Sequence, residues 1–164
     1  MAATGVRSVP DVIQAKKFEV VNDEGKVLVS LSNLQGGGVD NGMIETRIST
    51  GGVLAQIGAN RGGGSVTTQN GKGQLLVELG ATVDGEGMVE TQNGKGGTLV
   101  ALTASDGGGF VATQNGKGQA LVELGSSPMG GKILVSNTVG KGVLGMGGNP
   151  EDGSGVIVTF DSAG

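Results

Sequence analysis

Short runs in which apolar and polar residues alternate fill most of this chain, and glycine-rich stretches separate them. In one such run, Leu75, Val77 and Leu79 alternate with Leu76 and Glu78. A period of two places successive side chains on opposite faces of a β-strand. The pattern therefore predicts an all-β protein made of short strands and many turns.

The runs belong to an internal repeat. The motif Thr-Gln-Asn-Gly-Lys-Gly begins at Thr68, Thr91 and Thr113, so its copies are 23 and 22 residues apart. Weaker copies at 18–31, 43–57 and 133–146 give six units, with a half unit at 156–160. A repeat of this length is one supersecondary unit, here strand, turn, strand and loop. We expect a lead segment at 1–16, a single β-repeat array at 17–160 and a tail at 161–164.

Each clear copy of the motif contains an Asn-Gly pair, which is the strongest short-range signal for a β-hairpin. A type I′ turn needs positive φ at both central residues, and Asn and Gly tolerate that conformation. The sequence therefore predicts type I′ turns, formed by Asn70, Gly71, Asn93, Gly94, Asn115 and Gly116.

The strands that follow the turns are apolar on both faces. One face carries Leu75, Val77 and Leu79, and we expect it in a core. The other face keeps a large aliphatic side chain at the same place in every unit. Single exposed leucines are common on protein surfaces, but six in register form a stripe of the kind that soluble monomers avoid. We expect this column to be an oligomer interface, made of Leu28, Leu54, Leu76, Leu99, Leu121 and Val143.

Two architectures suit such a repeat: a single-chain β-solenoid, or hairpins contributed to a fibre of several chains. The leucine column favours the fibre, and so does a column of like charges at Lys26, Lys72, Lys95, Lys117 and Lys141. A closed homotrimer also removes the open edges of a hairpin meander. The expected fold is an elongated, repetitive β-hairpin or β-solenoid array of about 22-residue units, assembled as an intertwined homotrimer.

Composition narrows the chemistry. The chain has 36 glycines but only three prolines in 164 residues, which excludes collagen. It contains no cysteine and no histidine, so disulfides, thiolate metal sites and most familiar catalytic groups are missing. The 15 acidic and 11 basic residues give a net charge of -4, which disfavours nucleic-acid binding. We expect no enzyme, no cofactor, no resident metal and no nucleic-acid partner.

Local motifs change this picture little. No glycine-rich stretch reads as a phosphate-binding loop, and the acidic positions Asp84, Glu86, Asp106, Glu151 and Asp152 lack the spacing of calcium-binding repeats. Residues 1–16 lack the apolar core of a secretory signal, and no run of 18 apolar residues occurs. We expect no membrane insertion by this chain and a partner that is the chain itself.

Residues 12–31, which begin Val-Ile-Gln-Ala-Lys-Lys-Phe-Glu-Val-Val-Asn-Asp-Glu-Gly-Lys, resemble the start of bacterial glycine-rich surface proteins built from F-x-V-x-D-x-x-G-K-x-x-V-x-L units. In many of those proteins a membrane anchor or export signal precedes the first unit, and this sequence departs from them by lacking it. The pattern also resembles, generically, the β-helical shafts of trimeric phage fibres and spikes. The resemblance implies a location at the cell surface, outside the cell or on a virion.

The expected function is structural: a rigid shaft, spike or stalk formed by homo-oligomerisation, without catalysis. One alternative is a filament-forming β-solenoid scaffold that resembles the bactofilin class. Another is a surface-binding module for glycan or ice, because Thr68, Thr91 and Thr113 form a column like the flat threonine ladders of ice-binding solenoids. The sequence names no partner for either end of the shaft.

Overall fold

A computed structural model describes residue 12 and residues 14–34, 41–105 and 107–161 of the chain. Within these ranges the protein is all-β, with thirteen strands and no helix. The strands are β1 (Lys17–Val21), β2 (Val27–Leu34), β3 (Asn41–Arg47), β4 (Val53–Ala59), β5 (Gly64–Gln69), β6 (Leu75–Ala81), β7 (Gly87–Gln92), β8 (Thr98–Ser105), β9 (Gly108–Gln114), β10 (Ala120–Ser127), β11 (Gly130–Ser136), β12 (Gly142–Gly148) and β13 (Gly155–Thr159).

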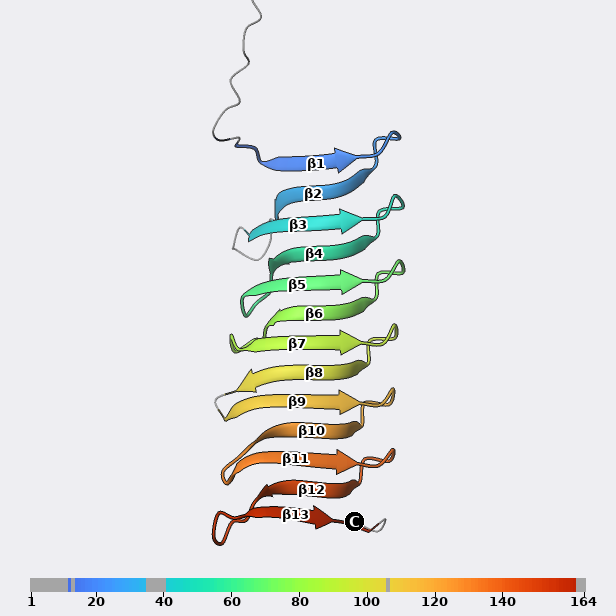
Figure 1. Cartoon of the computed structure of the whole chain (residues 1–164). Coiled ribbons are helices and arrows are strands. Elements are labelled where there is room, and N and C mark those ends of the chain that lie inside the picture. The colour runs from blue at the N-terminus through green and yellow to red at the C-terminus, as the bar shows by residue number, and fades with distance from the viewer. Residues whose placement is uncertain (1–11, 13, 35–40, 106, 162–164) are drawn as a thin grey trace, which may run out of the picture.

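The strands form one antiparallel sheet in chain order, and the sheet does not close on itself. Figure 1 shows them stacked like the rungs of a ladder, with β1 and β13 at opposite ends. Each strand contacts only its neighbours in the sequence among the described residues. In a single-chain solenoid, equivalent strands of successive units would stack directly on one another. Here an antiparallel strand separates them, so the chain is a meander of hairpins.

Tight turns connect each odd-numbered strand to the even-numbered strand that follows, and five of the six begin with an asparagine. In the turn between β5 and β6, the Gly73 amide donates to the Asn70 carbonyl at 2.9 Å, and the Asn70 amide donates to the Gln74 carbonyl at 2.9 Å. The Asn70 Oδ1 atom also accepts hydrogen bonds from the Lys72 amide at 2.9 Å and the Gln74 amide at 3.2 Å. The asparagine therefore closes the loop with its main chain and its side chain.

The turn conformation differs from the type I′ turn that the Asn-Gly pairs predicted. No non-glycine residue has positive φ in the described part of the chain, so Asn70 and its equivalents do not adopt it. Positive φ occurs instead at Gly73, Gly96 and Gly118, two residues after the glycine of each pair. This matches the three-residue hairpin loop, in which a type I turn precedes one left-handed residue. The prediction of positive φ at the Asn-Gly pairs is wrong because the loop is one residue longer than a type I′ turn and places its left-handed residue at the later glycine.

A β-bulge follows every tight turn. In the hairpin of β5 and β6, Gln69 pairs with Leu75 and Thr68 pairs with Val77, so Leu76 has no partner across the strands. The register shifts at the equivalent place in all six tight hairpins. One extra residue reverses the alternation of faces. Leu75 therefore does not share a face with Val77 and Leu79, as simple alternation had predicted.

The described residues of the single chain enclose no core of large side chains. Of the described residues, only Ser30, Glu45, Ala101 and Ala112 are buried, and no large side chain is fully enclosed. The expected core residue Leu79 is 52% exposed. A sheet with one apolar face normally has to cover that face with a second layer. This single-layer sheet has no second layer of its own.

Candidate assembly surface

One row of large apolar side chains crosses all thirteen strands. Residues that pair across neighbouring strands project from the same face of a sheet. Starting from Phe18 and following the pairing from strand to strand, every member of the row is apolar. The row consists of Phe18, Leu31, Ile44, Ile57, Val66, Leu79, Val89, Leu102, Val111, Leu124, Ile133, Met146 and Ile157.

Two further rows lie on the same face, two residues to either side of the central row, and neither contains a charged residue within the strands, although Lys16 occupies the corresponding place just before β1. Towards the tight turns the residues are Val20, Val29, Thr46, Ala55, Thr68, Val77, Thr91, Val100, Thr113, Val122, Val135, Leu144 and Thr159. Towards the opposite loops every residue is small: Asn33, Gly42, Ala59, Gly64, Ala81, Gly87, Ala104, Gly109, Ser126, Gly131, Gly148 and Gly155. We call these three rows together the apolar face.

The apolar face is open to solvent in the single chain. Leu79, Leu102 and Ile57 each expose about half of their surface, and Ile157 exposes 67%. The threonine column Thr68, Thr91 and Thr113 lies on this face, alternating with valine and alanine instead of forming an unbroken ladder. Exposed apolar surface that extends along the whole molecule marks an interaction site in a soluble protein.

The leucine column predicted from the sequence lies at the bulges. Each member follows a tight turn, has no cross-strand partner in the register and is half-buried in the single chain. These residues are Leu28, Leu54, Leu76, Leu99, Leu121 and Val143. Their role in an interface remains a prediction.

The opposite face, which we call the polar face, carries most of the strand carboxylates. Its middle row includes Glu45, Glu78, Glu90 and Glu123, and Glu78 pairs directly with Glu90. Glu78 and Glu123 are half-buried on this face.

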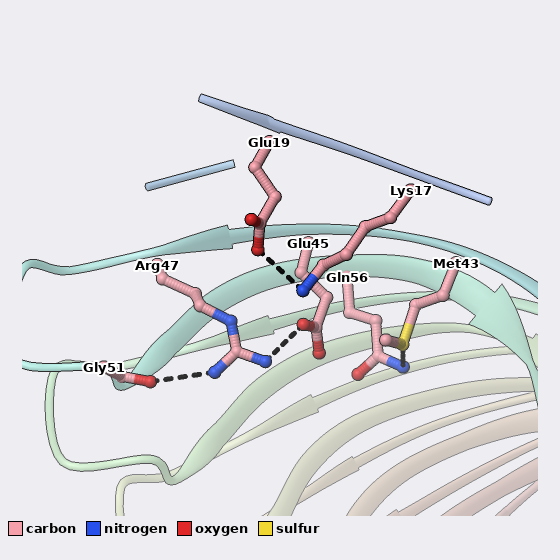
Figure 2. A network of polar contacts seen from close by, with 7 residues as sticks. All are labelled: Lys17, Glu19, Met43, Glu45, Arg47, Gly51 and Gln56. Carbon is pink, nitrogen blue, oxygen red and sulfur yellow. Dashed lines mark hydrogen bonds and ion pairs between the residues drawn. The ribbon is translucent and has the colours of Figure 1, made fainter. Parts of the chain in front are cut away.

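The most organised polar contacts lie at the β1 end of the polar face (Figure 2). The Lys17 ammonium lies 2.6 Å from a Glu19 carboxylate oxygen. Arg47 pairs with Glu45, which is only 6% exposed, and also donates to the Gly51 carbonyl at 3.0 Å. Each charge in this group has an opposite charge beside it. The network therefore pairs charges within β1 and within β3 and joins Arg47 to the turn that follows β3.

The described residues contain no group of three or more His, Cys, Asp or Glu side chains that could hold a metal ion. Nor do they contain a helix long and apolar enough to cross a membrane. Asp106, one of the acidic positions considered above, lies outside the described residues.

The chain matches no protein-family model, and no curated protein matches its sequence. The resemblance to bacterial repeat proteins and phage shafts therefore stays an expectation from the sequence. The argument for function rests on the apolar face.

Proposed function

We propose that this protein is a structural element, a rigid shaft, spike or stalk that forms when copies of the chain cover one another's apolar faces. One observation carries the proposal: the central row of the apolar face is unbroken over thirteen strands, while none of the described residues covers it. A sheet of this kind needs a partner layer for stability. No catalytic step is part of the proposal.

A second copy of the chain is the partner that fits this face. The uncharged surface runs the full length of the sheet, so its partner has to be equally long and equally apolar. Another copy presents the same length, the same strand spacing and the same rows. A shorter or charged partner would leave part of the row uncovered or would bury charges without partners.

The width of the sheet favours three copies. A strand of seven residues, the length of β4 or β6, spans roughly 20 Å at about 3.3 Å per residue. Three such sheets arranged as a triangular prism place the middle of each face roughly 6 Å from the axis. Sheets that pack face to face lie about 10 Å apart, or about 5 Å from the shared midplane. The two distances agree, so side chains of ordinary size fill the prism.

The order of the rows suits the same prism. The faces of neighbouring sheets approach one another most closely at the corners, and there only small side chains fit. The row of glycine, alanine, serine and asparagine runs along one long margin of the apolar face. The larger central row then lies in the middle of each sheet, where it meets the other two copies near the axis.

Measurement of mass in solution, with imaging of particle length, tests the proposal. We expect a number of 16.0 kDa chains that is a multiple of three, in rods roughly 58 Å long per sheet at about 4.8 Å per strand. A stable monomer, dimer or tetramer would contradict the trimer. An open-ended series of sizes would support the filament alternative instead.

A further inference from the structure

The last strand, β13, combines features that do not belong at a free sheet edge. Its sequence, Gly-Val-Ile-Val-Thr, contains no charge and no proline. All five of its residues are exposed, and among the described residues only β12 pairs with it. Natural proteins usually protect an exposed edge strand with charges, proline or a bulge, because its free main-chain groups pair readily with another strand.

The first strand shows that protection. β1 carries the charged residues Lys17 and Glu19, which form an ion pair on the polar face. The two ends of the sheet are therefore different. β1 has the charged residues of a protected edge strand, whereas β13 has the uncharged sequence of an interior strand.

Both faces of β13 support this view. Ile157 belongs to the apolar face, while Val156 and Val158 lie on the polar face, where they are 38% and 39% exposed. The middle row of the polar face contains no carboxylate in the last three strands. After Glu123 on β10, this row continues with Leu134 on β11, Gly145 on β12 and Val158 on β13. Continuous apolar runs are typical of strands that are covered on both sides.

The main-chain amides and carbonyls of β13 also point in the directions that pairing with another strand requires. The Phe160 amide donates to the Val143 carbonyl of the preceding segment at 3.1 Å, so Phe160 points towards β12. Successive residues of an antiparallel strand point their amide and carbonyl groups to alternate sides. The amides and carbonyls of Gly155, Ile157 and Thr159 therefore point to the free edge.

We propose that β13 pairs with β13 of a second copy, antiparallel across a twofold axis through Ile157, and so joins two sheets end to end. In this register Ile157 faces Ile157, and Val156 of each copy faces Val158 of the other. All five residues find partners without any like charges in contact, and the apolar face continues across the joint. The twofold axis is perpendicular to the sheet, so the same joint forms between single sheets or between two threefold prisms.

Charge placement tests the joint and its register. The variant Val156→Lys/Val158→Lys puts lysine opposite lysine at both pairs, where like charges are destabilising. The matched variant Val156→Lys/Val158→Glu places opposite charges at the same two pairs. By mass in buffer of low ionic strength, we expect the first variant to contain half as many chains as the wild type. We expect the second variant to keep the wild-type number.

Hydrogen exchange gives an independent readout of the same joint. In the wild type the amides of Gly155, Ile157 and Thr159 should be protected, and in the double-lysine variant they should exchange at least tenfold faster. The amides of Val156, Val158 and Phe160, which point to β12, should stay protected in both and show that β13 remains folded.

Three results would overturn the proposal: an unchanged mass in the double-lysine variant, equal dissociation of both variants, or fast exchange of the three edge amides in the wild type. The experiment distinguishes failure of the proposed β13 joint from failure of the proposed trimer. A wild type of two chains that becomes one supports the joint without the trimer, whereas a trimer that no variant changes supports the prism without the joint.

Discussion

Replacing three leucines of the central row tests the apolar face most directly. The variant Leu79→Gln/Leu102→Gln/Leu124→Gln changes β6, β8 and β10, and in the single chain these side chains are 52%, 50% and 42% exposed. Glutamine keeps a similar length but removes the apolar surface that a partner would cover. Each site lies two strands from the next, roughly 10 Å away, so their contributions should add.

The magnitude follows from the exposed fraction. Full burial of a leucine side chain is worth roughly 1.5–3 kcal/mol, and about half of each side chain remains to be covered, so each leucine contributes about 1 kcal/mol to assembly. Three leucines in each of three chains then contribute about 9 kcal/mol. At about 1.4 kcal/mol per factor of ten, the assembly constant should fall by roughly six orders of magnitude.

The assay is light scattering over a series of protein concentrations, with circular dichroism to follow the strands. The matched control Glu78→Gln/Glu90→Gln/Glu123→Gln makes three changes on the polar face and should leave the mass unchanged. A leucine variant that keeps the wild-type mass at every concentration would show that water, and not another copy, covers the apolar face. The structural proposal would then lose the observation that carries it.

Three further perturbations test separate features. Gly118→Ala forces a side chain into the left-handed conformation at φ +79° and should cost about 1–2 kcal/mol of folding free energy in denaturant unfolding, whereas Gly116→Ala, in equally open space without positive φ, should cost nothing. Ser154 donates to Asp152 from its hydroxyl and its amide, which lowers the pKa of that carboxyl and stabilises the fold above about pH 4, an effect lost as the pH falls; Ser154→Ala should raise that pKa in an NMR titration. The leucine column is tested by replacing Leu76, Leu99 and Leu121 with glutamate. If the interface predicted from the sequence is correct, light scattering should show that this variant no longer assembles.

Local patterns in the sequence predicted the strands and the positions of the tight turns. Alternation is a property of each segment alone, so the strand at 75–81 was recognisable without any knowledge of its neighbours. The type of turn depended on longer contacts. The loop is closed between Asn70 and Gln74, four residues apart, and its positive φ lies at Gly73 and not at Gly71.

The sequence predicted only part of the apolar face, namely the apolar positions within the strands that follow the turns. Leu79 was placed on an apolar face, but its partners Val66 and Val89 come from the strands that precede each turn, where the runs are short and rich in threonine. Pairing across strands, not alternation within one, joins them into a row. Cross-strand pairs assigned outward from each tight turn would give the central row only if one unpaired residue were allowed in the second strand. Alternation of apolar and polar residues within a strand does not reveal that unpaired residue.

The bulges decide which face is apolar. Without the extra residue at Leu76, Thr68 would pair with Leu76 and Val66 would pair with Glu78, so a carboxylate would interrupt the central row. With the bulge, Val66 pairs with Leu79 and the carboxylate of Glu78 lies on the polar face. The same shift recurs in all six hairpins that join an odd-numbered strand to the next even-numbered one, and in none of the six pairings of an even-numbered strand with the next odd-numbered one. The leucine repeated after every turn therefore marks the bulge that keeps thirteen strands in one apolar register, and a face maintained so regularly over the whole length is best explained by a partner of the same length.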